Sequence, residues 1–329
     1  MLKTAVIGTG TMGQNHARVL NEISQLVGVC DVNEAAAKTV AKRFNVLSFK
    51  DYHDLPKNVD AVTIATPTVT HKDIALDLIR LGKHVLVEKP LSNTVSSAQE
   101  IVDAASKQGV TLAVGHIERH NPAVKYVKSA VQKGQFGLVY TLSAKRVSSY
   151  PGRIGDVGVI IDLAIHDIDV IRYVTGFEVE SVFAAGGTMS TGKHEDVANI
   201  MLLMKGGVNG FIEVNWLTPM KIRKLTLICS MRHVEVDYMS QTVDISSSQM
   251  TELDPSNLSQ IPQEHDNRHI TLKKQEPLKN ELEDFLQSIE KHHPPLVTGL
   301  DGIAAVRIAQ AALDSLETRK VIELRGNGN

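Results

Sequence analysis

The sequence is poor in cysteine, and its charges nearly cancel. Its 329 residues include two cysteines, Cys30 and Cys229, and carry a formal net charge of −2 at pH 7. Both cysteines lie inside apolar segments, which is typical of buried free thiols in a reducing cytosol and not of a disulfide framework. Proteins that bind nucleic acid or a membrane surface usually have a basic face, so the near-neutral charge favours neither kind of partner.

Long apolar runs are missing as well. No stretch approaches the length of a membrane span, and the first residues, MLKTAVIGTG, enter a structured pattern at once, so we expect a cytoplasmic protein without a signal peptide. Repeats, low-complexity tracts, a G-x-S-x-G elbow and a P-loop lysine are also absent from the sequence. The H-x-x-x-H patterns at 116–120 and 265–269 have no companion cysteine pair, so no metal site is expected. The remaining composition, 43% apolar and 22% charged, is that of a globular chain long enough for two domains.

Two different rhythms of secondary structure follow one another along the chain. KTAVIG, LVGVCD, DAVTIAT, HVLVEKP and VTLAVG are predicted strands with amphipathic helices between them, which predicts a doubly wound parallel sheet of the Rossmann type at 1–120. From 121 to 329, consecutive strand-like runs interrupted by a helix at 158–174 predict an α+β domain with a mostly antiparallel sheet. We interpret the polar stretch 247–277 as a long excursion and expect helices at 278–292 and 300–318.

A glycine-rich turn stands directly after the first strand. VIGTGTMG places Gly8, Gly10 and Gly13 as G-x-G-x-x-G at the start of a helix. Such a turn lets backbone amides approach a pyrophosphate, and the N-terminus of the helix adds a positive end. We therefore predict that these glycines, with Thr11 and Met12 between them, bind a dinucleotide. A purely structural glycine turn is the alternative.

An acid at the end of the second strand supports the dinucleotide prediction. Asp31 lies at the distance beyond Gly10 that is expected for a residue binding the ribose hydroxyls. A carboxylate repels the 2′-phosphate of NADP, and no arginine or lysine follows until Lys38. NAD is therefore favoured over NADP.

A lysine leaves a buried strand at the edge of the same sheet. VLVEKPLSN puts Lys89 at the carboxyl end of its strand, where ligands bind in such folds. There it could stabilise a developing alkoxide beside the nicotinamide or share a proton. The alternative is a surface lysine at a strand that Pro90 ends. IATPTVTH (64–71) ends the preceding strand and forms the opposite wall. The cofactor contacts expected at this edge are Thr66, Pro67, His71, Glu88 and Lys89.

Charged residues interrupt the apolar run VGVIIDLAIHDIDVIRYV. On an α-helix Asp162, His166 and Asp169 fall on one stripe, at spacings i, i+4 and i+7. A helix that is apolar nearly all round is buried, and an unpaired buried charge is unfavourable, so the stripe should face a partner or a pocket. A buried Asp–His pair that only fixes the helix is the alternative, but the glycine loop and Lys89 favour catalysis. Asp167 and Asp169 are expected to make structural hydrogen bonds.

The motifs together resemble a known family. GTGTMG, ATPTVTH, VEKP and GVIIDLAIHDID are similar to segments of the glucose–fructose oxidoreductase / inositol dehydrogenase / MocA (Gfo/Idh/MocA) family, from residue 1 to about 320. In that family the lysine of E-K-P and a D-x-x-x-H pair form the catalytic group, which implies Lys89, Asp162 and His166 here. The resemblance also implies an open sheet in the second domain, a homodimer or homotetramer, and a final helix that packs back on the first domain.

A narrower resemblance concerns the substrate. VGHIERHNPAV (114–124) and RIGDVGVIIDLAIHDID (153–169) resemble segments of UDP-N-acetylglucosamine 3-dehydrogenases and related nucleotide-sugar oxidoreductases. This implies NAD-dependent oxidation of a sugar hydroxyl. His166 would take the proton, Asp162 would orient the imidazole and Lys89 would hold the oxygen, although Lys89 and His166 could exchange roles.

The substrate contacts and the alternatives complete the prediction. A UDP-sugar needs cations or amide donors for its pyrophosphate. The expected substrate contacts are Arg119, Asn121, Arg153 and His166, with Arg146 a weaker candidate. An inositol or simple-sugar dehydrogenase is the alternative within the same class. A non-catalytic NAD-binding regulator is the alternative outside it, and a trio such as Lys89, Asp162 and His166 counts against that alternative.

Overall fold

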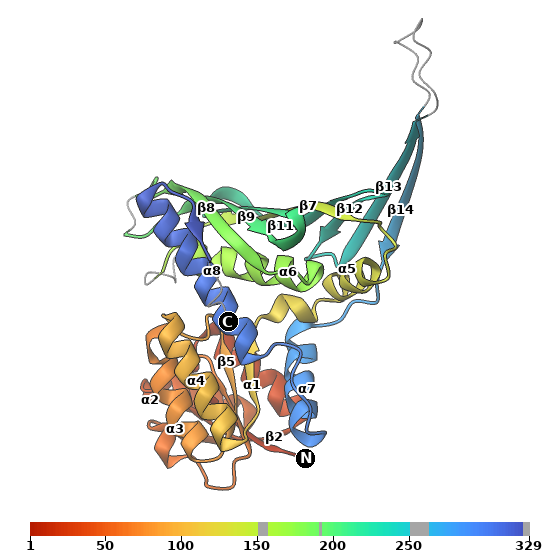
Figure 1. Ribbon diagram of the computed structural model, residues 1–329. Helices are drawn as coiled ribbons and strands as arrows, with labels where there is room; N and C mark the ends of the chain where they lie inside the picture. The colour runs from red at the N-terminus through yellow and green to blue at the C-terminus, as the bar shows by residue number, and fades with distance from the viewer. Residues whose placement is uncertain (151–156, 191–192, 251–262, 325–329) are drawn as a thin grey trace, which may run out of the picture. The chain divides into compact units, whose positions relative to one another are not determined.

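The chain consists of two compact units, each built on its own sheet (Figure 1). The computed structural model describes residues 1–150, 157–190, 193–250 and 263–324. The first unit comprises Met1–His120 and Gln275–Arg307, and the second comprises Asn121–Lys274 and Ile308–Asn329. In the described ranges no helix has the length and apolarity that crossing a membrane requires.

The first unit contains a six-stranded parallel sheet in the order β3-β2-β1-β4-β5-β6. The order reverses between β1 and β4, and ligands of such folds bind beyond the carboxyl ends of the strands at this switch point. The predicted Rossmann architecture is confirmed. The strands are β1 (Lys3–Ile7), β2 (Gln25–Cys30), β3 (Leu47–Phe49), β4 (Ala61–Ile64), β5 (His84–Glu88) and β6 (Leu112–Gly115).

Helices cover both faces of this sheet. One core cluster joins the strands to α3 (His71–Arg80) and α4 (Val95–Gln108), and a second joins them to α1 (Thr11–Ile23) and α2 (Glu34–Phe44). Three short 3₁₀ turns, η1 (Tyr52–Asp54), η2 (Thr68–Thr70) and η3 (Ile117–His120), lie in the connections. Apart from the edge strand β3, the strands are therefore largely buried on both sides, which explains their continuous apolar runs.

The helix near the end of the chain belongs to the first unit and not to the second, where the sequence analysis placed it. α7 (Pro277–Glu290) packs beside α1, because its apolar stripe completes the second core cluster. Burial of such side chains contributes roughly 1.5–3 kcal/mol each. The long helix α8 (Gly299–Thr318) begins in the first unit and ends in the second. The buried residues of the α7 stripe are Leu278, Leu282, Phe285, Leu286 and Ile289.

The second unit contains a nine-stranded sheet in the order β14-β13-β12-β11-β7-β10-β9-β8-β15. Its neighbouring strands pair antiparallel except β10 and β7, which confirms the mostly antiparallel sheet. The strands are β7 (Val139–Ser149), β8 (Val179–Gly187), β9 (Val197–Met204), β10 (Asn209–Asn215), β11 (Leu217–Cys229), β12 (His233–Asp237), β13 (Thr242–Met250), β14 (Gln263–Thr271) and β15 (Ile322–Glu323). A short turn, η5 (Lys205–Gly207), joins β9 to β10.

Helices α5 (Pro122–Gln132) and α6 (Ile165–Thr175) lie against one face of this sheet (Figure 1). The residues of β10 alternate between buried and more exposed positions, which is the pattern of a sheet covered on one side. The interpretation of 247–277 as an excursion was wrong at two places, because β13 extends to Met250 and a further strand follows. Gln263–Thr271 forms β14 and pairs with β13 in a long antiparallel hairpin.

Candidate active site

The glycine loop occupies the switch point of the first sheet, between β1 and α1. Gly8 has φ +91°, and a Cβ on it would lie 2.4 Å from the carbonyl oxygen of Ala65. A Cβ on Gly13 would lie 1.8 Å from the carbonyl oxygen of Gly8, so both positions require glycine for protein packing. Gly10 is exposed, and a Cβ there would meet nothing within 4 Å. The open side of the turn at Gly10 and Thr11 is therefore where a ligand has room.

Asp31 is held at the end of β2 by three donors. The backbone N–H and the hydroxyl of Thr9 donate to its Oδ2 at 2.7 and 2.8 Å, and the backbone N–H of Asn33 donates to Oδ1 at 2.8 Å. Burial alone would raise the pKa of Asp31, but these hydrogen bonds outweigh it and lower the pKa below the usual value. Asp31 is thus an ionised, half-buried carboxylate fixed against the glycine loop.

The β5 strand ends at a second group of polar residues. Glu88 is 8% exposed and turned into the domain, where its Oε1 accepts from Nε2 of His16 at 2.9 Å. Its Oε2 accepts from the backbone N–H of Lys89 at 3.1 Å. Lys89 itself is half-buried and is followed by a cis peptide bond to Pro90. The expected direct contact of Glu88 with a cofactor is therefore less favoured than a role in fixing the Lys89 backbone.

His71 joins the ends of β4 and β5. It is 1% exposed, with Nδ1 2.9 Å from the carbonyl oxygen of Pro90 and Nε2 2.9 Å from that of Thr66. Burial lowers the pKa of His71, so the ring is neutral at pH 7 and one nitrogen donates. His71 thus connects the segment that follows β4 to the segment that follows β5 from the buried side. Thr66 is half-buried and Pro67 is exposed.

In the second unit, Asp162 and His166 lie on a helix that begins irregularly. Residues Ile160–Ala164 (η4) form a π-helical turn that continues into α6. The stripe expected from regular α-helical spacing therefore does not hold across Asp162, because a π turn adds a residue to the helical repeat. Exposure divides the charged residues differently: Asp162 and His166 are half-buried, whereas Asp167 and Asp169 are 0% and 1% exposed. Such π turns are frequent at functional sites.

Glu195 fixes the start of this helix, and sequence reasoning did not select it. Its Oε1 accepts from the backbone N–H of Ile160 at 3.1 Å, and its backbone carbonyl accepts from the N–H of Val159 at 3.0 Å. The carboxylate lies where a side chain of Gly158 would be, since a Cβ there would come within 2.1 Å of it. A remote acid therefore satisfies the first N–H groups of the turn that carries Asp162.

Asp167 is engaged in a buried ion pair with Arg146. Nε of Arg146 donates to Oδ2 at 2.7 Å and the second guanidinium nitrogen donates to Oδ1 at 3.0 Å, with both residues at most 2% exposed. The hydroxyl of Tyr238 donates to the same carboxylate at 3.4 Å. This pair connects α6 to β7, so Arg146 is better explained as a structural residue than as the weak substrate candidate of the sequence analysis.

The other expected substrate contacts also have protein partners. Arg119 is 5% exposed and pairs with Asp301 at 2.9 Å. Asn121 is 1% exposed, and its Oδ1 accepts from the N–H of Ala123 at the start of α5 while its Nδ2 donates to the carbonyl of Tyr238. These contacts favour structural roles for Arg119 and Asn121. Arg153 lies outside the described residues.

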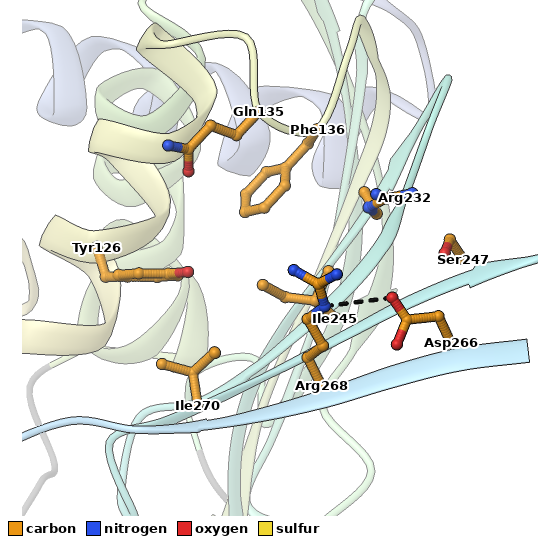
Figure 2. A pocket seen from close by; sticks show the side chains of 9 residues that line it. All are labelled: Tyr126, Gln135, Phe136, Arg232, Ile245, Ser247, Asp266, Arg268 and Ile270. Atoms are coloured by element: carbon orange, nitrogen blue, oxygen red, sulfur yellow. Dashed lines mark hydrogen bonds and ion pairs between the residues drawn. The ribbon is translucent and has the colours of Figure 1, made fainter.

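A separate cavity of about 370 Å³ lies between α5 and strands β13 and β14 (Figure 2). Its wall includes Tyr126, Arg232 and Arg268. Asp266 accepts from Nε of Arg268 at 3.2 Å, so Arg232 alone adds net positive charge to the lining. A pyrophosphate is bound by several cations or amides, so the lining of this cavity does not favour pyrophosphate binding.

The β3-β2-β1-β4-β5-β6 order, the glycine turn and the anchored Asp31 define a dinucleotide-binding oxidoreductase fold. Residues 2–116 match the profile described as "Oxidoreductase family, NAD-binding Rossmann fold", and residues 124–235 match the GFO/IDH/MocA C-terminal domain. The chain belongs to the Gfo/Idh/MocA family of oxidoreductases, and the resemblance drawn from its motifs is confirmed.

Relatives match the chain over nearly its whole length. UDP-N-acetylglucosamine 3-dehydrogenase from Acidithiobacillus ferrooxidans is 33% identical over 95% of each chain. Myo-inositol 2-dehydrogenase from Thermotoga maritima is 28% identical over 98% of each chain. A solved structure of the Acidithiobacillus enzyme superposes with a TM-score of 0.86 at 30% identity and covers 96% of this chain and 98% of that one.

Three polar residues of the first unit were not selected from the sequence. Thr9 fixes Asp31, and His16 and Glu281 lie with Glu88 in a buried cluster. His16 and Glu281 each occupy the buried stripe of an amphipathic helix, where a charged or titratable side chain is unusual. That position on the helix was the signal that could have identified both.

Proposed function

We propose that the protein is an NAD-dependent dehydrogenase that oxidises a ring hydroxyl of a nucleotide sugar, with oxidation of UDP-N-acetylglucosamine at its 3-position as the candidate reaction. The observation that carries this proposal is the 33% identity to the Acidithiobacillus enzyme over 95% of both chains. The family matches at 2–116 and 124–235 include Lys89 at the end of β5 and the Asp162–His166 segment.

Asp31 supports NAD as the cofactor. Its carboxylate is ionised and half-buried, and it would accept hydrogen bonds from the ribose hydroxyls but repel a 2′-phosphate. Lys38, the first cation after Asp31 in the sequence, pairs with Glu34 at 2.6 Å and so does not provide a ready phosphate site. The proposed cofactor contacts are Gly8, Gly10, Thr11, Met12, Gly13, Asp31, Thr66, Pro67 and Lys89, with His71 and Glu88 acting from behind them.

The proposed chemistry needs a base for the hydroxyl proton and a cation for the oxygen. Bound nicotinamide supplies the hydride acceptor. His166 accepts the hydroxyl proton, and Asp162 orients and stabilises the imidazolium that results. Lys89 donates to the substrate oxygen as negative charge develops on it.

A second candidate is inositol oxidation. The Thermotoga myo-inositol 2-dehydrogenase also matches 98% of this chain, at 28% identity. Both candidate reactions would use the same Lys89, Asp162 and His166, and they differ in what must be bound beyond the reacting ring. A nucleotide sugar would need donors for its pyrophosphate, whereas inositol would not.

A substrate panel tests the proposal. NAD reduction is followed at the nicotinamide absorbance with UDP-N-acetylglucosamine, N-acetylglucosamine, myo-inositol and glucose. Turnover of the UDP-sugar well above that of the free sugar would support a nucleotide-sugar dehydrogenase. Equal turnover of free sugars, or turnover of myo-inositol alone, would overturn that part of the proposal. Binding of NAD without turnover of any substrate would favour a non-catalytic regulator.

A further inference from the structure

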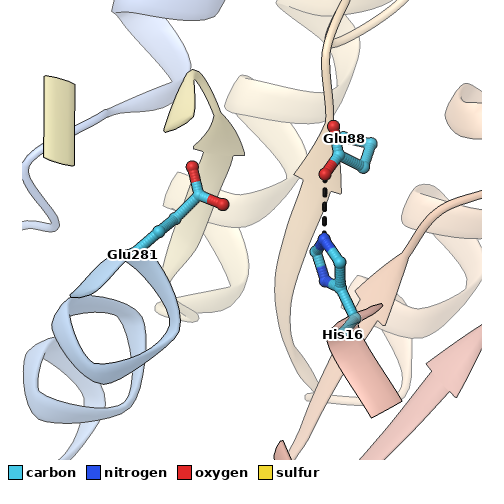
Figure 3. Close-up of side chains that lie close together, drawn as sticks. All are labelled: His16, Glu88 and Glu281. Carbon is cyan, nitrogen blue, oxygen red and sulfur yellow. Dashed lines mark hydrogen bonds and ion pairs between the residues drawn. The ribbon is translucent and has the colours of Figure 1, made fainter. Parts of the chain in front are cut away.

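A cluster of three buried ionisable side chains lies inside the first unit, directly behind Lys89. His16 of α1, Glu88 of β5 and Glu281 of α7 are 0%, 8% and 2% exposed. One nitrogen or oxygen atom of each lies within 4.8 Å of the others. Figure 3 shows Glu281 extending from its helix toward the hydrogen-bonded pair of His16 and Glu88.

Glu88 is the fixed member of this cluster. One of its oxygens accepts from Nε2 of His16 and the other accepts from the backbone N–H of Lys89. Its carboxylate also lies 3.0 Å from where a Cβ of Gly115 would be, so glycine at that position of β6 leaves it room. The place of the Lys89 backbone therefore depends on where the Glu88 carboxylate is held.

The buried carboxyl group of Glu281 lacks hydrogen-bond partners among the described residues. Both of its oxygens are buried, and neither has such a partner. An ionised carboxylate in such a place is strongly unfavourable unless a cation compensates it. A protonated carboxyl is neutral, and it also brings one O–H donor to a cluster whose other acid is a carboxylate.

The two acidic neighbours of Glu281 act against its ionisation. Glu88 faces it from β5, and Asp284 lies on its own helix. On α1, Arg18 is paired with Glu276 and Glu22, which leaves His16 as the facing group of that helix. The η3 turn packed on α7 carries Glu118, Arg119 and His120, and Arg119 is paired with Asp301.

The two carboxyls of the cluster respond to this environment in opposite directions. Burial, and then the charges of Glu88 and Asp284, raise the pKa of Glu281 well above its ordinary value. Burial also acts to raise the pKa of Glu88, but the hydrogen bond and charge of His16, with Lys89 nearby, outweigh it and lower that pKa. Two neighbouring acids whose pKa values move apart divide into one carboxylate and one carboxylic acid.

We propose that Glu281 is a neutral carboxylic acid beside the Glu88 carboxylate, and that Glu281 and His16 are positioning residues that hold Glu88 and, through it, the backbone of Lys89. The significance of Lys89 rests on the proposed function, but the protonation of Glu281 and the anchoring of the Lys89 backbone do not. The proton on Glu281 would then neutralise one acid in a cluster whose ligand atoms lie close enough together to hold a metal ion.

The first test uses the pH dependence of thermal stability. An acid whose pKa is raised by folding contributes fully to stability only below its ordinary value of 4.5, and that contribution is lost as the pH rises through the raised value. Glu281→Gln cannot titrate and keeps a donor of the same shape. Its melting temperature should equal that of the wild type near pH 4 and exceed it by about 5 °C at pH 9. Glu283→Gln, on the same helix, should show no such trend.

The second test follows the backbone N–H of Lys89 by amide hydrogen exchange, which requires no substrate. Glu281→Met fills the same volume without a donor, and exchange at Lys89 should become about tenfold faster, as expected for one weakened hydrogen bond to a charged acceptor. Glu281→Gln should restore the wild-type protection. If turnover with every sugar fails, this result still separates the positioning role from the proposed function.

Three results would overturn the proposal in whole or in part. Destabilisation by Glu281→Gln that grows toward alkaline pH would mean that Glu281 is ionised and compensated. Stoichiometric metal in the purified protein, lost together with stability on chelation, would mean that a cation and not a proton occupies the cluster. Equal exchange at Lys89 in the Glu281→Met variant and the wild type would remove the positioning role.

Discussion

Asp31, the acid at the end of β2, is held by hydrogen bonds that the sequence does not reveal. One oxygen of Asp31 accepts from two donors of Thr9, and the other accepts from the N–H of Asn33. These hydrogen bonds fix the orientation of the Asp31 carboxylate without a ligand. Pre-organisation of this kind reduces the ordering needed when a ribose binds.

Replacing this acid should weaken NAD binding and relax cofactor choice. In Asp31→Ala the dissociation constant for NAD should rise about tenfold or more, since hydrogen bonds to a charged group contribute about 1.5–3 kcal/mol. NADP should bind more tightly than it does to the wild type, because the repulsion of its 2′-phosphate is removed. Titration of the protein with each cofactor measures both effects.

Lys38→Ala is the matched control, because Lys38 is paired with Glu34 and should not influence either cofactor. Unchanged discrimination between NAD and NADP in Asp31→Ala would contradict the assignment of Asp31 to the ribose.

The proposed base should affect turnover without affecting NAD binding. His166→Ala should lower kcat by about 10²–10⁴, the range for loss of a general base, and should leave the dissociation constant of NAD unchanged. His166 belongs to the second unit, whereas the glycine loop and Asp31 belong to the first. Stopped-flow measurement of NAD reduction, with NAD binding measured separately, distinguishes the two effects.

Lys89→Met provides the comparison, because it removes a cation and keeps the length of the side chain. Near-wild-type turnover in His166→Ala together with a large loss in Lys89→Met would assign the base to Lys89 and exchange the two proposed roles.

Residues whose partners are close in sequence were the ones that sequence reasoning could interpret. Gly8, Gly10 and Asp31 follow a local strand–turn–helix pattern, so their placement at one sheet edge was predictable. Arg119 was interpreted as a substrate contact because a pyrophosphate needs cations, and its protein partner, Asp301, could not be recognised because it lies far along the chain. The same separation in sequence hides the proximity of Glu281 to His16 and Glu88. The helical pattern could have marked His16 and Glu281 one by one as unusual buried residues, but it could not have paired them with each other.

At the scale of elements, regular periodicity predicted most helices and strands and failed where an element is irregular. The π turn at Ile160–Ala164 breaks the 3.6-residue repeat, so a stripe drawn through Asp162 and Asp169 joined a half-buried residue to a buried one. The strand Gln263–Thr271 was missed because its described side chains are mostly exposed and polar, as at the edge of a sheet. Such a strand shows no apolar alternation.

The π turn should be sensitive to a single methyl group at Gly158. A Cβ there would lie 2.1 Å from the carboxylate that receives the N–H of Ile160. Gly158→Ala should therefore displace Glu195, destabilise the second unit by about 1–3 kcal/mol and lower turnover, because Asp162 moves with the turn. Chemical denaturation and NAD reduction measure the two consequences.

Glu195→Ala removes the obstructing carboxylate at the expense of a helix cap, which should destabilise by about 1 kcal/mol. If the clash is the cause, the double variant should be less destabilised than the sum of the single variants. Strictly additive effects would show that Gly158 is required for another reason.

At the scale of the whole molecule, one face of the nine-stranded sheet lacks a covering layer among the described elements. α5 and α6 occupy the opposite face (Figure 1). A hollow of about 540 Å³ on the open face is lined by apolar side chains, including Phe183 and Phe211, with Lys145, Glu213 and Lys224 beside them. Phe183 and Phe211 are 36% and 41% exposed. Contiguous exposed apolar residues rimmed by charges are typical of an interaction surface.

This face should mediate association with a second copy of the chain. A self-complementary surface on a twofold axis brings each patch against its own equivalent, and Phe211 lies within the apolar part of the hollow. The wild type should therefore be a dimer or a tetramer by size-exclusion chromatography with light scattering, and Phe211→Glu should shift it toward the 35.9 kDa monomer.

Phe177→Glu changes an equally exposed phenylalanine outside the lining of this hollow and should leave the mass unchanged. NAD binding should persist in both variants, because the dinucleotide fold belongs to the first unit. A monomeric wild type, or an oligomer that survives Phe211→Glu, would mean that this face serves another purpose.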